Sequence, residues 1–387
     1  MTFTNAQLIL PETIRRGTLT VRDGRITRVT ASARGDGRPP GSINLRGGYL
    51  APGFIDLHIH GGLGRDTMEA TTDAFRTITE FHLRGGTTST ALTTVTATEK
   101  EILRVLEAAR PLQNRSIGGA RILGIHIEGP FISKAKPGAQ NPKQIREPRA
   151  VEWKKYLRFG KLVTEMTVAP EIPGALALLR ALRKNGTLAS GGHTDAIENE
   201  LRPALAAGLN HSTHTFNAMS MAARRGPYRV AGMLEFALAH PEICCELIAD
   251  GVHVAPTLMR MLFNAKGRHG VCLITDATGG AGLKPGTIFD VGGIPARVTE
   301  DAALLADGSA LAGSTLTMIE AVRRAVQLGG APLVDAVRMA ALNPARQLRR
   351  ESEFGSIEPG KRADLVWFDK QFCVRGVWLD GDMRFLK

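Results

Sequence analysis

The feature that most constrains this chain is a short apolar run that ends in two histidines one residue apart. The segment Pro52–Gly62 reads PGFIDLHIHGG, so a predicted strand carries His58 and His60 and stops at paired glycines. Side chains alternate between the two faces of a strand, so residues two apart point the same way. His58 and His60 can therefore bind one cation through neutral imidazole nitrogens, although an isolated pair of this kind can also arise by chance.

The middle of the chain alternates strand-like apolar runs with helical segments, which is typical of a parallel α/β fold. Helices are expected at 73–84, 99–110 and 173–184, and the last ends at Asn185-Gly186, a favourable C-cap. Eight strands are expected, ending at or near His60, Thr94, Glu128, Pro170, His193, His214, Asp250 and Asp276. Eight such units predict a (β/α)8 TIM-like barrel, whose active site lies at the carboxyl ends of its strands.

Both ends of the chain are rich in predicted strands. Asp23-Gly24 and Asp380-Gly381 are suited to tight hairpin turns, and residues 33–41 are expected to form a loop. We infer that the two ends pair into a small β-sandwich domain, residues 1–52 and 345–387, with the (β/α)8 barrel, residues 53–344, inserted between them.

Composition limits the partners. The 387 residues are 43% hydrophobic and 22% charged, which is ordinary for a globular protein; no apolar run is long enough to span a bilayer, and the amino terminus lacks a signal-peptide pattern. The four cysteines form no C-x-x-C pair, which favours a reducing cytoplasm. The net charge of +12 suggests an anionic partner, but the basic residues are scattered and only 5% of residues are aromatic, so a small anionic substrate is favoured over nucleic acid.

Residues able to bind a metal recur at the predicted strand ends. Glu128 follows the run ILGIHI, His193 follows two glycines, and His214 and Asp276 end two further strands. A histidine that only packs has no reason to prefer these positions, so a shared divalent-metal site is predicted. His126, deeper in its strand, is interpreted as packing or supporting the ligands, and three histidines on helices or their ends are interpreted as structural: His82, His240 and His269.

Seven motifs in order carry a resemblance that covers nearly the whole chain. They are PGFIDLHIHG, EGPF at 128–131, GGHTDA at 191–196, THTFNAM at 213–219, ADGVH at 249–253, TDAT at 275–278 and LAGSTL at 311–316. Together they resemble the N-acetylglucosamine-6-phosphate deacetylase family of the amidohydrolase superfamily. The resemblance implies a metal-dependent enzyme that acts as a homodimer on an amino-sugar phosphate.

The resemblance also implies roles for individual residues. Glu128, His193 and His214 would hold the principal metal, and Asp276 would act as the catalytic acid and base beside it. His58 and His60 match members with a second metal, so one or two ions such as zinc, iron or manganese are expected. Substrate-binding positions would be Ala139, Gln140, Asn217, Ala218, Arg225, Asp250, Gly251, His253, Leu311, Ala312 and Gly313. Arg224 and Arg229 compete with Arg225 for the match, and the family's arginine can reach across a dimer interface.

Gln140 departs from the family, which usually has histidine there. Glutamine can donate a hydrogen bond to a substrate carbonyl but never ionises. Three interpretations stay open: Gln140 replaces a carbonyl-polarising histidine, it only closes the loop at 136–142, or it fits a different acyl group or sugar epimer.

The predicted reaction is hydrolysis of the acetamide of N-acetylglucosamine 6-phosphate to glucosamine 6-phosphate and acetate by metal-activated water, with Asp276 moving the proton. The main alternative is an N-acetylgalactosamine-6-phosphate deacetylase. A cyclic-amide hydrolase is less favoured, because that branch uses a modified lysine and the strand that ends at Thr167-Val168-Ala169-Pro170 has none. A non-catalytic sugar-phosphate-binding barrel is a remote alternative, because an unused site has no reason to keep buried acids and imidazoles together.

Overall fold

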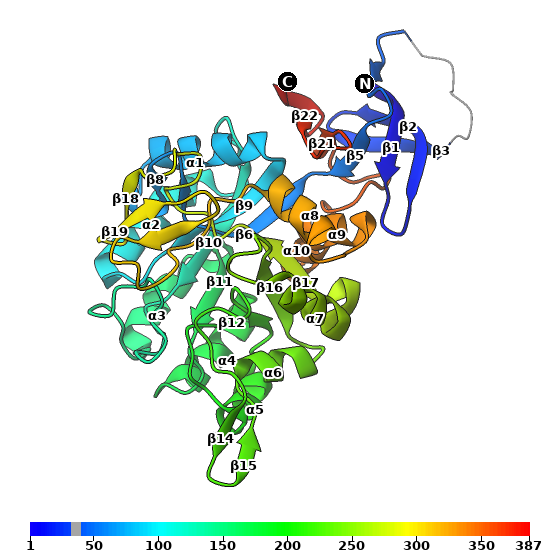
Figure 1. Cartoon of the computed structure of the whole chain (residues 1–387). Helices are drawn as coiled ribbons and strands as arrows, with labels where there is room; N and C mark the ends of the chain where they lie inside the picture. Colours follow the sequence, from blue (N-terminus) through cyan, green and yellow to red (C-terminus); the bar gives the residue numbers. More distant parts are fainter. Residues whose placement is uncertain (32–39) are drawn as a thin grey trace.

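The computed structural model describes residues 1–31 and 40–387 and contains a parallel barrel beside a second, β-rich domain (Figure 1). The predicted TIM-like barrel is confirmed. Its eight strands are β6 (Phe54–Ile59), β9 (Thr87–Thr94), β10 (Arg121–Glu128), β11 (Val163–Val168), β12 (Leu188–Gly191), β13 (His211–Ser212), β16 (Cys244–Ile248) and β17 (Val271–Ile274).

The barrel closes between its first and last strands, just past the end of β17. The backbone N–H of Asp276 donates to the carbonyl of His58 at 2.9 Å, and the N–H of His60 donates to the carbonyl of Ala277 at 2.8 Å. Closure therefore brings the His58–His60 segment beside Asp276, although more than two hundred residues separate them in the chain.

Ten helices are described. They are α1 (Thr72–Arg84), α2 (Glu99–Ala109), α3 (Ala150–Leu157), α4 (Ala175–Asn185), α5 (Glu198–Ala207), α6 (Met233–Ala239), α7 (Pro256–Lys266), α8 (Met318–Gln327), α9 (Leu333–Ala340) and α10 (Leu342–Gln347). The sequence explains their limits: Thr98 and Glu101 form a capping box at the start of α2, and Gly186 ends α4 with φ +74°. The helices expected from the sequence at 73–84, 99–110 and 173–184 are confirmed to within two residues.

The two chain ends form one eight-stranded sheet. Its strands are β1 (Thr2–Ile9), β2 (Ile14–Arg22), β3 (Arg25–Ala31), β4 (Ile43–Asn44), β5 (Tyr49–Pro52), β21 (Leu365–Phe368), β22 (Val374–Leu379) and β23 (Asp382–Leu386). Antiparallel pairing of β5 with β21 joins the two ends, and the Phe3 and Trp378 rings meet at 4.8 Å within the core of this domain. The β-rich domain built from both ends is thus confirmed, with the predicted turns at Asp23-Gly24 and Asp380-Gly381.

A buried ion pair fixes this sheet against the barrel. Arg121, at the start of β10, is 2.6 Å from Asp364 and 2.7 Å from Asp380. The predicted domain boundaries stay a prediction. Helix α10 extends across the predicted boundary between residues 344 and 345. The predicted loop at 33–41 lies mostly outside the described residues.

Several short elements lie outside the eight barrel strands and the ten helices. They are β7 (Gly61–Gly62), β8 (Arg65–Asp66), the exposed hairpin β14 (Ala223–Arg225) with β15 (Tyr228–Val230), the sheet of β18 (Ile288–Val291), β19 (Ile294–Val298) and β20 (Ala303–Leu305), and the 3-10 turns η1 (Thr67–Glu69), η2 (Arg110–Leu112), η3 (Gly160–Leu162) and η4 (Gly267–His269). Within the described ranges, no helix has both the length and the apolar character needed to cross a membrane.

Candidate metal centre and active site

The predicted ligands stand at or just beyond the carboxyl ends of barrel strands. Glu128 is the last residue of β10, as predicted, and His60 follows β6 directly. His193, His214 and Asp276 each lie two residues past a strand, so the strand ends predicted at these residues were wrong. Their backbones have φ of +46°, +28° and +49°, and this left-handed conformation, which few non-glycine residues adopt, breaks the strand.

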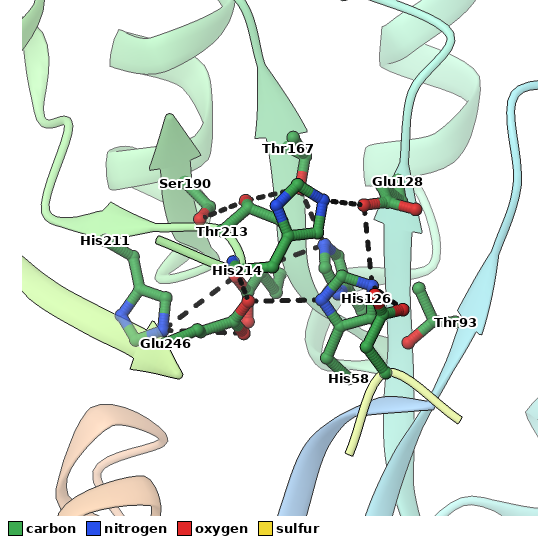
Figure 2. Close-up of polar contacts among 12 residues, drawn as sticks. His58, Thr93, His126, Glu128, Thr167, Ser190, His211, Thr213, His214 and Glu246 are labelled. Carbon is green, nitrogen blue, oxygen red and sulfur yellow. Dashed lines mark hydrogen bonds and ion pairs between the residues drawn. The ribbon is translucent and has the colours of Figure 1, made fainter. Parts of the chain in front are cut away.

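One group of converging ligand atoms consists of Glu128, His193 and His214 (Figure 2 labels the first and last). Oε1 of Glu128 is 3.0 Å from Nε2 of His214 and 3.3 Å from Nε2 of His193. The two ring nitrogens are 3.0 Å apart. Three buried side chains, at or just past the ends of three strands, thus direct their ligand atoms to one point.

A second group consists of His58, His60 and Asp276. Nε2 of His58 and Nε2 of His60 are 3.2 Å apart, and Oδ1 of Asp276 lies 3.4 Å from the former and 3.2 Å from the latter. The His-x-His pair therefore lies on one side of the backbone, as predicted, and the closure of the barrel supplies its third member.

Glu128 joins the two groups. Its Oε1 faces the His193–His214 pair, while its Oε2 is 3.3 Å from Nε2 of His60. A carboxylate placed between two ligand groups, with one oxygen toward each, has the geometry of a bridge.

The six residues fit divalent metal ions. Tetrahedral sites with metal–ligand distances of about 2.0–2.2 Å place their ligand atoms about 3.3–3.6 Å apart, close to the separations in both groups. Nδ1 of His193 donates to the carbonyl of Lys136 at 2.9 Å, and Nδ1 of His58 donates to Glu246 at 3.1 Å. These bonds place the ring proton on Nδ1 and leave the Nε2 lone pair for a cation.

The electrostatics of the group agree with cation binding. Burial alone would raise the pKa of Glu128, but the His58, His193 and His214 imidazoles hold it well below its usual range. Burial would lower the pKa of His60, but Asp276 and Glu128 raise it to about 9. Without an ion, the carboxylates thus favour protonated His58 and His60, and a bound metal would replace these protons.

Gln140 belongs to the centre through Glu128. Its Nε2 donates to Oε2 of Glu128 at 2.6 Å, and its Oε1 accepts the backbone N–H of Thr96, also at 2.6 Å. The side chain is buried and its amide is held at both ends. Gln140 therefore links the loop at 136–142 directly to the carboxylate that lies between the two groups.

A cavity of about 380 Å³ opens above the two groups. Its floor includes His60, Glu128, His193, His214 and Asp276, and its walls come from the loop at 135–140, the segment after β13 and the turn that follows β20. The predicted substrate-binding residues that line it are Ala139, Gln140, Asn217, Ala218, His253, Leu311, Ala312 and Gly313.

Three predicted substrate-binding residues do not line this cavity. Asp250 is buried beside it and accepts a hydrogen bond from Nδ1 of His253 at 2.5 Å, so it orients a lining residue. Gly251 lies in the same turn, with φ +79°. Arg225 is exposed on the β14–β15 hairpin, which extends away from the barrel in Figure 1.

The structure also adds residues that the sequence did not single out. Lys136 and Thr278 line the cavity, and Glu246, in the middle of β16, contacts His58. A glutamate within the apolar run Ile243–Ile248 was the available signal, since an acid is rarely buried without a partner. His126 lies below the centre, with Nε2 2.8 Å from Thr167, and the three histidines interpreted as structural are outside the cavity lining: His82, His240 and His269.

Comparisons with known proteins agree on one family. A model of the amidohydrolase family matches residues 49–384. The chain is 39% identical to an N-acetylglucosamine-6-phosphate deacetylase of Bacillus subtilis, covering 92% of this chain and 89% of that protein, and 34% identical to an N-acetylgalactosamine-6-phosphate deacetylase of Escherichia coli O157:H7, covering 86% and 87%. A mutant N-acetyl-D-glucosamine-6-phosphate deacetylase from Mycobacterium smegmatis, solved with N-acetyl-D-glucosamine-6-phosphate, superposes with a TM-score of 0.90 at 33% identity over 99% of both chains.

Proposed function

Since the chain belongs to the amidohydrolase family, we propose that it hydrolyses the acetamide of N-acetylglucosamine 6-phosphate to glucosamine 6-phosphate and acetate. The observation that carries this proposal is the pair of metal-ligand groups joined by Glu128 at the floor of the cavity. Relatives that cover most of the chain and bear this name support the substrate.

We propose that the centre holds up to two divalent ions. Glu128, His193 and His214 would hold the principal ion, and His58, His60 and Asp276 the second, with Glu128 between them. When bound, such ions acidify water and polarise a carbonyl. Mixed imidazole and carboxylate ligands suit zinc, iron and manganese alike, so the ligands do not select among them.

Asp276 is assigned the proton transfer. Its carboxylate belongs to the second ligand group and lines the cavity, so it can take a proton from the attacking water and return it to the departing amine. An amine leaves poorly as an anion, so a proton delivered at its nitrogen is what allows the C–N bond to break. Glu128 is held among its imidazoles, and Gln140 also donates a hydrogen bond to it.

The phosphate is proposed to bind at the far end of the cavity. Asp250 accepts the Nδ1 proton of His253, which leaves Nε2 of this ring for a ligand. Arg225 would join it from a second copy of the chain in a homodimer, because its hairpin is exposed and lies outside the cavity of its own chain. Such anchoring orients the acetamide over the ligand groups.

A second candidate substrate is N-acetylgalactosamine 6-phosphate, which differs at one hydroxyl. The Escherichia coli relative named for this substrate covers 86% of the chain. We also propose a cytoplasmic location and a homodimer.

The decisive experiment measures acetate release from both N-acetylhexosamine 6-phosphates and from the same sugars without phosphate. We expect release from a 6-phosphate, loss of activity after chelation and its return on adding a divalent metal. Equal rates with and without the phosphate would contradict the substrate class, and no release from any of these sugars would contradict the reaction. A preference for the galactose epimer would select the second candidate.

A further inference from the structure

Glu246 lies beneath the metal centre and touches both ligand groups. It is fully buried in β16, inside the barrel (Figure 2). One carboxylate oxygen, Oε2, accepts the Nδ1 proton of His58 at 3.1 Å and the backbone N–H of His214 at 3.0 Å. His58 belongs to one group and His214 to the other, so a single atom contacts a member of each.

We propose that Glu246 is a positioning residue that holds the two ligand groups in register, an inference that rests on the proposed metal-dependent function. A carboxylate acceptor at Nδ1 of His58 fixes the tautomer and the ring orientation that direct Nε2 toward the centre. The same oxygen anchors the backbone of His214, whose φ of +28° is a strained value for a residue with a side chain.

The alternative is that Glu246 only fills the polar interior of the barrel. Its other oxygen, Oε1, is 3.7 Å from Nε2 of His211, which in turn lies 4.0 Å from Glu165. Glu165 is as deeply buried as Glu246, yet within the described part of the chain no hydrogen bond or ion pair joins it to any of the six ligand residues. Glu165 therefore shares the environment of Glu246 without its contacts to His58 and His214.

This pair of glutamates gives a matched test. Glu246→Met keeps the length of the side chain but removes the acceptor, and Glu246→Gln keeps an oxygen but removes the charge that strengthens the bond. Glu165→Gln is the control. The measurements are zinc content per chain after dialysis, the zinc Kd by competition with a chromogenic chelator, and the melting temperature.

We expect Glu246→Met to weaken the binding of one zinc ion by about 10–100-fold, as for other residues that support a metal ligand. Glu246→Gln is expected to weaken zinc binding by about tenfold. Glu165→Gln is expected to bind zinc with the affinity of the wild type. Folded Glu246 variants with wild-type zinc affinity would overturn the inference, and so would an equal loss in Glu165→Gln. If Glu246→Met does not fold, the comparison of Glu246→Gln with Glu165→Gln decides.

The test of Glu246 and the test of the proposed reaction can fail independently. If the wild type releases no acetate but the Glu246 variants bind zinc more weakly, the deacetylase reaction is refuted and the positioning role of Glu246 is retained. Acetate release by the wild type with unchanged zinc affinity in the variants would refute only the positioning role.

Discussion

Asp276 stands where the barrel closes. Its backbone N–H donates to the carbonyl of His58, and its side chain faces both His58 and His60. One residue thus helps to complete the barrel, contributes to a ligand group and carries the proposed proton. The contact that closes the barrel uses the backbone of Asp276, whereas the other two tasks use its side chain. We therefore expect a substitution of the side chain to reduce catalysis more than it reduces the stability of the fold.

We expect Asp276→Asn to remain folded and to lose turnover by about 10²–10⁴-fold, because an amide cannot accept and return a proton. Steady-state kcat, substrate Kd and metal content should be measured together, since the residue is also a proposed ligand. Asp195→Asn is the control, because Asp195 is 3.6 Å from Lys136 at the rim of the cavity and outside its lining. Turnover near that of the wild type in Asp276→Asn would refute the mechanism.

Gln140 offers a second test at the scale of the residue. Gln140→Leu removes the donor to Glu128 and the acceptor for Thr96, so we expect metal affinity and activity to fall by about 10–100-fold. Gln140→His can keep one hydrogen-bond donor, so its metal affinity and activity should fall less than those of Gln140→Leu. A rise in turnover for Gln140→His would instead support the interpretation that this position polarises the substrate carbonyl.

Among the elements, α1 shows how a helix supports the centre without reaching it. Thr71 caps its first turn, and His82 near its last turn is fully buried. Nε2 of His82 donates to the carbonyl of Gly61 at 3.0 Å, directly after His60. The helix thus holds the turn that ends β6.

Burial lowers the pKa of His82 to about 4, although the bond to Gly61 opposes the shift. The unfolded chain, with an ordinary pKa of about 6.5, takes up this proton first, so stability is full above about pH 6.5 and falls as the pH drops to about 4. Over this pH range the lost stability amounts to about 3 kcal/mol.

The measurement is urea unfolding of metal-free wild type and His82→Gln between pH 4 and 7. The variant should be less stable at pH 7, through lost packing, but should lose less stability on acidification. Parallel pH profiles for the two proteins would show that His82 is not the group that takes up the proton.

At the scale of the whole molecule, the β14–β15 hairpin projects from the barrel (Figure 1). It exposes Arg225 and 72% of Tyr228, and Met221 before it is 57% exposed. Exposed aromatic and arginine side chains on a protruding hairpin suit contact with a second copy. Most oligomers of one chain are symmetric dimers, in which each hairpin would reach the other subunit.

Mixing two impaired variants, one in Arg225 and one in Asp276, tests this arrangement. Arg225→Ala should raise KM for the 6-phosphate substrate. Arg224→Ala is the control and should have little effect on KM, because the Arg224 guanidinium donates to the carbonyl of Gly226 within the hairpin. If Arg225 acts across the interface, Arg225→Ala mixed with Asp276→Asn forms heterodimers in which one site has both residues intact. We expect that site to recover the wild-type KM. No recovery in a mixture shown by mass spectrometry to contain heterodimers would place Arg225 in its own chain's site or outside catalysis.

Local patterns in the sequence determined the barrel and most of the centre. Alternation along β6 places His58 and His60 on one face, and apolar runs followed by Glu128, His193, His214 and Asp276 mark carboxyl strand ends, which all meet at one end of a parallel barrel. The turns at Asp23-Gly24 and Asp380-Gly381 likewise depend on neighbours in the chain.

Only the tertiary structure decided which atoms meet. The strand ends at His193, His214 and Asp276 were placed two residues late, because left-handed backbone at a non-glycine residue has no local signal. The contact of Glu246 with His58 spans 188 residues, and the bond from Gln140 to Glu128 depends on how a loop folds over the cavity. Periodicity fixes the face on which a side chain lies, whereas the distance between two strands is set by barrel closure and packing, which depend on the whole chain.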